Sequence, residues 1–372
     1  MEYRQLGKTG LRVSQLGFGA MRLPMVNEGR PDAAVDRDKA IEMIHRAFEG
    51  GVNYVDTAVG YCNQDSQRAV GEALKGWRDR IVVSTKNPYY GESETEWWAN
   101  LTNSLDRLGT DCIDIYNHHG ISRDRWNDVQ KRVGAWMLKA RDQGLIRHIC
   151  CSFHSDNALL RELVDSGYVA SITLQYNMLD RKLEEGIAYA ASNGVGVVVM
   201  GPVAGGRLGV RSEVLEKLLP GIDRVPQLAL RFVLSNPNIS IALSGMSTLE
   251  QVEENLRVAS DTGFSAEDSE AIEAHVTRLR KMADLYCTGC NYCLPCPQSV
   301  AISRVFETYN HGAVFGLWEA ARAAYNRIGT APWDEGRNAS ACIECGQCEP
   351  RCPQNIPIRR QLKEVHAALA DQ

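Results

Sequence analysis

Eight cysteines gather near the C-terminal end of this 372-residue chain. They fall in two short runs, CTGCNYCLPCP from residue 287 and CIECGQCEPRCP from residue 342, and each run ends in Cys-Pro. Thiolates ligate zinc and iron–sulfur clusters, and three cysteines at two-residue spacing let one tight loop present three thiolates on one face of a cluster. The spacing therefore predicts metal ligation by Cys287, Cys290, Cys293, Cys296, Cys342, Cys345, Cys348 and Cys352.

The spacing within the two runs favours iron–sulfur clusters over zinc. The second run has the spacing C-x2-C-x2-C-x3-C-P of bacterial ferredoxins, in which the fourth cysteine ligates the other cluster, and the first run has one residue fewer before its last cysteine. Zinc is the alternative, although its sites usually combine two separated C-x2-C pairs. We expect two 4Fe–4S clusters, one held by Cys287, Cys290, Cys293 and Cys352 and the other by Cys342, Cys345, Cys348 and Cys296.

The bulk properties of the chain exclude several classes of protein. A formal net charge of −5 and a pI near 6.0 give no basic surface for nucleic acid or an anionic membrane. No apolar run is long enough to span a bilayer, and the start of the chain lacks the segments of a secretory signal. We therefore expect a cytoplasmic protein with reduced thiols, and disulfides are the weaker alternative for its 12 cysteines.

A second set of reactive side chains follows three successive strand-like segments. Asp56 and Tyr61 lie in DTAVGYC, Lys86 ends RIVVSTK, and His119 ends IDIYNHH. The carboxyl ends of parallel strands meet at one edge of a sheet or barrel, so an acid, a phenol, an amine and an imidazole are expected to converge there. Such a set suits proton transfer to or from a carbonyl or alcohol oxygen.

Each of these residue types has a defined part in that chemistry. A free tyrosine titrates near pH ~10, and we expect the Lys86 ammonium to lower the pKa of Tyr61. Asp56 would hold the lysine in place, and a histidine would orient the substrate oxygen by donating a hydrogen bond. None of these side chains can supply a hydride, so the chemistry requires a nicotinamide cofactor.

The elements that must position these residues alternate along residues 1–262. Eight short β-branched segments are each followed by a longer amphipathic stretch, and glycines close many of those stretches. Eight βα units over roughly 260 residues make a closed (β/α)8 TIM barrel, with an open doubly wound sheet as the alternative. We expect a barrel over 1–262 that begins with a hairpin, a connecting helix over 263–284, and a cysteine domain over 285–372 whose middle, 302–328, is helical.

Residues 1–262 resemble the aldo/keto reductase family. The resemblance runs in order through the whole barrel, in GVNYVDTAVGYCNQDSQRAVGEALKG, IVVSTK, IDIYNHHG, VVVMGPVAGGRLG and LSGMSTLEQVEEN. It implies NAD(P)H-dependent chemistry on a small carbonyl or alcohol substrate, with Tyr61 as proton donor. The family's histidine lies five residues after an aspartate, here Asp114, which favours His119 over His118. The family's catalytic tetrad therefore falls on Asp56, Tyr61, Lys86 and His119.

The loops after the last two strands are the candidates for binding the dinucleotide. No G-x-G-x-x-G follows a strand, and barrel enzymes bind phosphates with the loops after strands seven and eight. The loops GPVAGGRLG and SGMSTLEQVEEN offer Gly205, Gly206, Arg207, Gly245 and Ser247. By resemblance the cofactor also contacts Ser152, Gln175 and Asn255, and Met200 stands where many family members have an aromatic residue. The choice between NADH and NADPH stays open, because the last of these loops lacks the basic residue of NADP-selective members.

The cysteine domain resembles the α-helical ferredoxin domains that are fused to other oxidoreductases. Its clusters would exchange single electrons with a redox partner protein, whereas a nicotinamide moves two electrons as a hydride. Two alternatives stay open. In the first, the clusters of the same enzyme are structural or oxygen-sensing, and in the second, the chain is a regulatory subunit that binds nucleotide with little turnover.

Overall fold

The computed structural model describes residues 1–27, 30, 33–217, 222–260, 270–274, 277, 287, 291–330, 336–352 and 355–371. The chain divides into two compact units, Met1–Ala204 with Ala229–Gly263, and Gly205–Leu228 with Phe264–Gln372. The connecting helix predicted over 263–284 lies for the most part outside the described residues. Within the described ranges no helix is both long and apolar enough to cross a bilayer.

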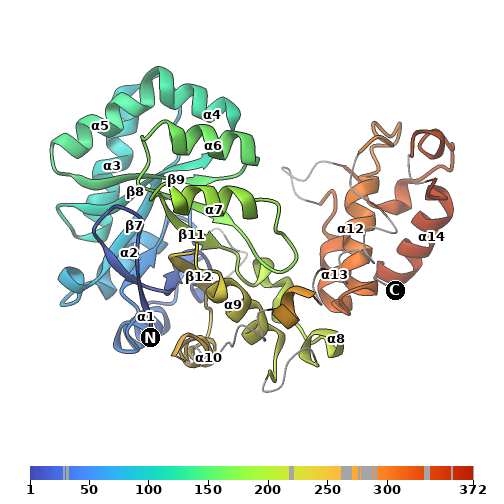
Figure 1. Ribbon diagram of the computed structural model, residues 1–372, viewed down its shortest axis with the longest axis horizontal. Helices are drawn as coiled ribbons and strands as arrows, with labels where there is room; N and C mark the ends of the chain where they lie inside the picture. The colour runs from blue at the N-terminus through green and yellow to red at the C-terminus, as the bar shows by residue number, and fades with distance from the viewer. Residues whose placement is uncertain are drawn as a thin grey trace. The chain divides into compact units, whose positions relative to one another are not determined.

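Eight parallel strands close into a barrel in the first unit (Figure 1). Each strand pairs with the next one along the chain, and the last pairs with the first, Ala242 standing opposite Leu16. This topology confirms the predicted (β/α)8 barrel and excludes the open sheet. The barrel strands are β3 (Leu16–Gly19), β6 (Tyr54–Asp56), β7 (Val82–Asn87), β8 (Ile113–Ile121), β9 (Ile146–Phe153), β10 (Ser171–Gln175), β11 (Gly196–Met200) and β12 (Ile241–Gly245).

Helices that follow the strands surround the barrel (Figure 1). Their starts follow ordinary capping rules: the side chain of Asp36 accepts a hydrogen bond from the backbone N–H of Lys39, and that of Ser93 accepts one from Glu96. A π-helical turn, Val129–Val133, interrupts the fourth helical segment. The helices are α1 (Arg37–Glu49), α2 (Ser66–Ala73), α3 (Glu94–Leu108), α4 (Arg123–Asp128), α5 (Gly134–Asp142), α6 (Asn157–Asp165), α7 (Glu184–Ser192), α9 (Val225–Ser235) and α10 (Leu249–Ser260).

The amino-terminal end of the barrel is closed by the predicted hairpin. Strands β1 (Tyr3–Gln5) and β2 (Arg12–Ser14) pair antiparallel, and a second small ribbon joins β4 (Met25–Val26) to β5 (Ala34–Val35). Apolar side chains of the first hairpin and of the barrel interior form one buried cluster. Its members are Leu6, Val13, Tyr54, Ile115, Cys150, Val198, Ile241 and Leu243.

The second unit packs three helices around its own apolar core (Figure 1). They are α12 (Ile302–Ala313), α13 (Trp318–Asn326) and α14 (Ile358–Leu369), and the first two confirm the helical middle of the cysteine domain. The unit also contains the short helix α8 (Glu213–Glu216). The buried hydroxyl of Tyr325 lies 2.7 Å from Nδ1 of His366 and accepts a hydrogen bond from the backbone of Ala339. These bonds tie two helices to the segment that leads into the second cysteine run.

We predict that Gly71→Ala destabilises the barrel by about 1–3 kcal/mol, although alanine has the higher helix propensity. A Cβ atom on Gly71 would lie 2.3 Å from the backbone oxygen of Arg107, so α2 and α3 would have to separate. Chemical unfolding checks this, with Gly60→Ala as the control because nothing lies within 4 Å of a Cβ there. Equal stability of the two variants would contradict the close packing of these helices.

Candidate active site and cluster cavity

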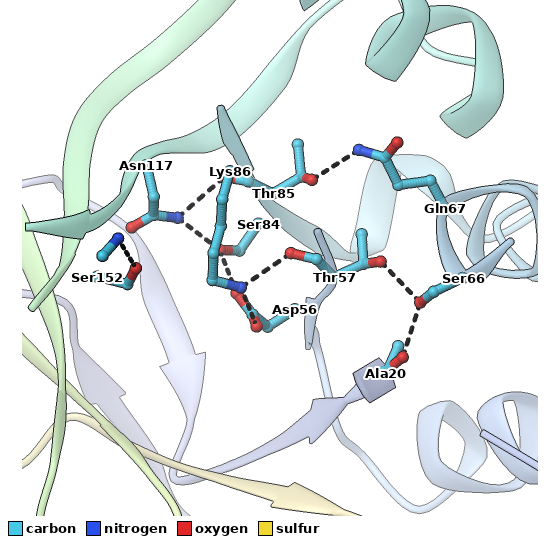
Figure 2. A network of polar contacts seen from close by, with 11 residues as sticks. Ala20, Asp56, Thr57, Ser66, Gln67, Ser84, Thr85, Lys86, Asn117 and Ser152 are labelled. Atoms are coloured by element: carbon cyan, nitrogen blue, oxygen red, sulfur yellow. Dashed lines mark hydrogen bonds and ion pairs between the residues drawn. The ribbon is translucent and has the colours of Figure 1, made fainter. Parts of the chain in front are cut away.

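A buried ion pair stands at the carboxyl ends of β6 and β7. The side chains of Lys86 and Asp56 are 2% and 6% exposed, and Nζ lies 2.6 Å from Oδ2. The ammonium also donates to the backbone oxygen of Thr57 at 2.9 Å, and Ser84 donates to the other carboxylate oxygen at 2.8 Å (Figure 2). Burial is the largest single effect and opposes the charge, but Asp56 and Tyr61 together outweigh it and raise the pKa of Lys86. The lysine therefore stays an ammonium.

Further polar side chains on the inner faces of the strands support this pair (Figure 2). The amide of Asn117 donates to the hydroxyl of Ser84 and to the backbone oxygen of Thr85, both at 3.0 Å. The hydroxyls of Thr57 and Ser66 lie 2.8 Å apart. Asn117 and Ser84 are absent from the sequence-based set, although their inward-facing positions in otherwise apolar strands are a readable signal.

Tyr61 lies beside the ammonium. Nζ of Lys86 is 4.8 Å from the centroid of the phenol ring. The expectation that Lys86 lowers the pKa of Tyr61 is wrong in its net direction. Burial of the phenol is the largest effect, it outweighs the attraction of Lys86, and it raises the pKa of Tyr61 above its ordinary value. Tyr61 therefore carries its proton at neutral pH.

A left-handed turn follows Tyr61 and fixes its position. Cys62, Asn63 and Gln64 have φ angles of 48°, 54° and 66°, a conformation that costs about 1–2 kcal/mol per residue. Asp65 offsets this cost, because its carboxylate accepts from Arg37 at 2.6 Å and from the backbone N–H of Val35 at 2.9 Å. The backbone N–H of Asp65 also donates to the oxygen of Tyr61 at 3.2 Å. Sequence patterns alone did not reveal this clamp.

The two adjacent histidines have different surroundings. Nε2 of His118 lies 2.9 Å from the hydroxyl of Tyr168 in the protein interior. The ring of His119 faces Tyr61 edge-on, with 6.3 Å between the ring centroids. Burial, followed by the charges of Lys86 and Arg125, lowers the pKa of His119 to about 4, so its imidazole is neutral. The structure thus brings together Asp56, Tyr61, Lys86 and His119 at one part of the rim.

Four of the residues predicted to contact the nucleotide lie on the other half of the rim. Ser152, Gln175, Met200 and Gly245 stand at or next to the carboxyl ends of the consecutive strands β9, β10, β11 and β12. These four residues form an arc of the rim that faces the strands β6, β7 and β8, which carry the ion pair and His119. The half-buried amide of Gln175 makes no hydrogen bond to any residue that the structure describes. An open amide and the nearby hydroxyl of Ser152 match the hydrogen-bonding groups of a nicotinamide carboxamide.

The remaining predicted nucleotide contacts are distributed between the two units. The hydroxyl of Ser247 donates to the backbone of Arg22 at 2.9 Å, and the buried amide of Asn255 donates to the hydroxyl of Ser244 at 2.9 Å. The first bond ties the loop after β12 to the turn after β3, and the second links α10 to the end of β12. Gly205, Gly206 and Arg207 belong to the second compact unit, where both glycines adopt the left-handed conformation.

Cysteines from both runs line one cavity in the second unit. Cys287 and Cys352 pack against the edge of the unit's apolar core, whereas Cys290 lies outside the described residues. Among the side chains that the structure describes, no three metal-binding groups converge on a point that would hold a single ion. The cysteines of both runs nevertheless share one cavity, as a cluster ligated by both runs requires. The cysteines that line this cavity are Cys293, Cys296, Cys342, Cys345 and Cys348.

Comparison with known protein families shows to which class of protein this chain belongs. A model of the aldo/keto reductase family matches residues 15–277, so this chain belongs to the aldo/keto reductase family. A model of the 4Fe-4S dicluster domain matches residues 286–356. Both predicted resemblances are thereby confirmed, and the chain is an iron–sulfur oxidoreductase.

Relatives of this chain match about three quarters of its length. The uncharacterized oxidoreductase YqkF of Bacillus subtilis (strain 168) is 26% identical over 310 residues, which cover 74% of this chain and 96% of the relative. The NADH-specific methylglyoxal reductase of Escherichia coli (strain K12) is 28% identical over 330 residues and covers 75% and 97%. Among solved structures, a holo-form aldo-keto reductase from Bacillus halodurans has 30% identity and a TM-score of 0.63, and covers 74% and 96%.

We predict that Asp56→Asn lowers the free energy of unfolding by about 3–5 kcal/mol, because it leaves the buried ammonium of Lys86 without its counter-charge. Urea unfolding followed by tryptophan fluorescence measures this loss. The double variant Asp56→Asn/Lys86→Met should recover much of the stability, because the two changes remove the pair together. A single variant as stable as the unmodified protein would show that the pair is not desolvated.

Proposed function

We propose that the barrel transfers a hydride between NAD(P)(H) and a small carbonyl or alcohol substrate. The observation that carries this proposal is the protonated phenol of Tyr61 beside the permanently charged, buried Lys86. A proton donor needs its proton at working pH, and the base it leaves behind needs a nearby positive charge. The names of several relatives, among them the methylglyoxal reductase and an L-galactose dehydrogenase of Arabidopsis thaliana, support a small substrate of this kind.

Four side chains divide the work at the substrate oxygen. Tyr61 donates its phenolic proton to the carbonyl oxygen, and the ammonium of Lys86 stabilises the phenolate that remains. Asp56 holds the ammonium in place through the 2.6 Å ion pair. His119, which is neutral, donates one ring N–H to the same oxygen and orients it. In the direction of alcohol oxidation the same groups accept the proton.

The arc of Ser152, Gln175, Met200 and Gly245 would hold the nicotinamide end of the cofactor, with Ser247 and Asn255 near the phosphates. A nicotinamide bound there supplies or accepts the hydride. That Gly205, Gly206 and Arg207 of the second unit contact the phosphates stays a prediction from the resemblance. Because the carboxamide partners lie on β9 and β10 and the proton donor follows β6, the substrate would be held between the two halves of the rim.

The cysteine domain is proposed to hold two 4Fe–4S clusters. The cavity is lined by Cys293 and Cys296 of the first run and by Cys342, Cys345 and Cys348 of the second, which supports a cluster ligated by both runs. The crossed ligand set takes Cys296 for this cluster and leaves Cys293 to the other. Arg359 lines the same cavity, but its guanidinium is already paired with Glu349 at 2.8 Å. The first triplet with Cys352 would hold the other cluster.

The clusters are proposed to exchange single electrons with a partner protein. The side chain of Cys345 is exposed, so the cluster it would ligate lies close to the surface. The rival roles make different predictions. Structural or sensing clusters would leave hydride transfer unaffected on cluster removal, and a regulatory subunit would show little turnover of any carbonyl compound.

We predict that carbonyl reduction is insensitive to pH from about 5 to about 9 and falls only above the raised pKa of Tyr61. His119 gains charge only near pH 4, since burial lowers its pKa to about 4, and Tyr61 loses its proton only above its ordinary value near ~10. The measurement is kcat/KM against pH, with Tyr61→Phe as the test of the donor. A steep fall between pH 7 and 8, or a Tyr61→Phe variant of undiminished activity, would overturn this assignment.

We predict that Cys345→Ser lowers the iron content by about four atoms per chain, because one cluster is lost. Iron and sulfide analysis after anaerobic purification checks this, together with the electron paramagnetic resonance spectrum of the reduced protein. Cys112→Ser is the matched control, since Cys112 lies in the barrel unit. An unchanged iron content in Cys345→Ser would remove this residue from the ligand set.

A further inference from the structure

Arg125 projects from α4 to the part of the rim that carries His119. Its Nη1 donates to the backbone oxygens of His119 and Gly120 at 3.0 and 2.9 Å, and its guanidinium carbon lies 5.1 Å from the centroid of the Tyr90 ring. The hydroxyl of Tyr90 donates to the backbone oxygen of His119 at 3.0 Å, so the arginine is held on a fixed surface. The side chain is nevertheless exposed.

The guanidinium of Arg125 retains unused donors. Its Nε and Nη2 make no hydrogen bond to any described residue, and no described carboxylate forms an ion pair with it. Nearby arginines behave differently: Arg123 pairs with Glu162, and Arg132 pairs with Asp128 at 3.0 Å. An arginine that is fixed in place but has no protein carboxylate is available to an anion.

His154 lies next to this arginine. Nη1 of Arg125 and Cδ2 of His154 are 2.5 and 3.8 Å from the position that a Cβ atom on Gly120 would occupy, so the two side chains flank this glycine. His154 is exposed, and its ring makes no hydrogen bond to a residue within the described ranges. Burial, then the charges of Arg125 and Lys86, lower the pKa of His154, which shows that it shares the electrostatic field of the active site.

Arg125 and Lys86 are the two positive charges that act on His154. The carboxylate of Asp56 is already engaged by Lys86 and Ser84. Arg125 follows β8 and His154 follows β9, whereas the glycine and serine predicted to approach the cofactor follow β12. In the eight-stranded barrel β8 and β12 are separated by half the circumference. The pair is thus remote from the expected phosphate loop, and its natural ligand is a group on the substrate.

We propose that Arg125 and His154 bind the anionic group, a carboxylate or a phosphate ester, of a small aldehyde or ketone whose carbonyl oxygen lies against Tyr61 and His119. This inference rests on the proposed function and names the substrate class. Arg125 donates through Nε and Nη2 to two oxygens of the anion, and His154 donates one ring N–H to it.

Two matched pairs of aldehydes test this substrate class with the holoenzyme. Butanal is compared with succinic semialdehyde, and glyceraldehyde with glyceraldehyde 3-phosphate, so that each pair differs in one anionic group. We expect the charged member of one pair to have a kcat/KM at least about tenfold higher, and Arg125→Met to lower that ratio by about 10–100-fold, mainly through KM. The pair of aldehydes with the larger ratio of kcat/KM values shows whether the site prefers a carboxylate or a phosphate ester.

Two further variants control this experiment. Arg125→Lys keeps the charge and should restore part of the ratio, whereas Arg123→Met removes a charge from the same helix and should leave the ratio unchanged. The proposal is overturned by ratios near one for both pairs in the unmodified protein. It is equally overturned by a ratio that Arg125→Met leaves unchanged, or that Arg123→Met lowers as much.

Equilibrium binding separates this proposal from the proposed function. If no aldehyde is reduced, hydride transfer is disproved, and calorimetric titration with succinate and with inorganic phosphate decides the anion site. Binding of either ion by the unmodified protein that is lost in Arg125→Met upholds the site. No binding to the unmodified protein, or equal binding to both proteins, overturns it.

Discussion

The ion pair between Lys86 and Asp56 is the constraint on which the arrangement of the site depends. A desolvated ammonium is stable only when its charge and its hydrogen bonds are matched, so the strand ends supply a carboxylate, a hydroxyl and a backbone oxygen. The opposite end of the barrel interior is apolar and closed by the N-terminal hairpin. The polar network is thereby confined to the rim, where it acts on Tyr61.

The active site balances burial against charge in a way that differs from residue to residue. At Lys86 the carboxylate of Asp56 and the phenol of Tyr61 together outweigh burial, the pKa of the ammonium is raised, and the group stays charged. At Tyr61 and His119 burial prevails, and both stay neutral. A fixed positive charge beside Tyr61, whose ring also faces the neutral His119, suits an oxygen that gains negative charge as it receives a hydride. Under the proposed function, the cysteines of the second unit would serve a separate, one-electron chemistry, and the two activities would be divided between the two compact units.

The barrel and the iron–sulfur domain could be predicted because both leave local patterns in the sequence. Strand periodicity and glycine caps define the βα units, and cysteine spacing defines the ligand loops. The pKa of Tyr61 was predicted in the wrong direction because burial is a tertiary property. The clamp of Arg37 on Asp65 joins residues 28 positions apart, and the approach of Arg125 to His154 depends on two loops meeting at the rim. No local sequence pattern predicts such long-range contacts.

The central claim is that Tyr61 is held protonated beside a permanent ammonium. The most direct measurement is a carbon-13 nuclear magnetic resonance titration of protein labelled at Cζ of tyrosine, with the Tyr61 signal assigned from its absence in Tyr61→Phe. The account predicts a chemical shift of neutral phenol for Tyr61 up to pH 9 or beyond. A signal that moves to the phenolate position between pH 7 and 8 would contradict it, because the charge of Lys86 would then outweigh burial.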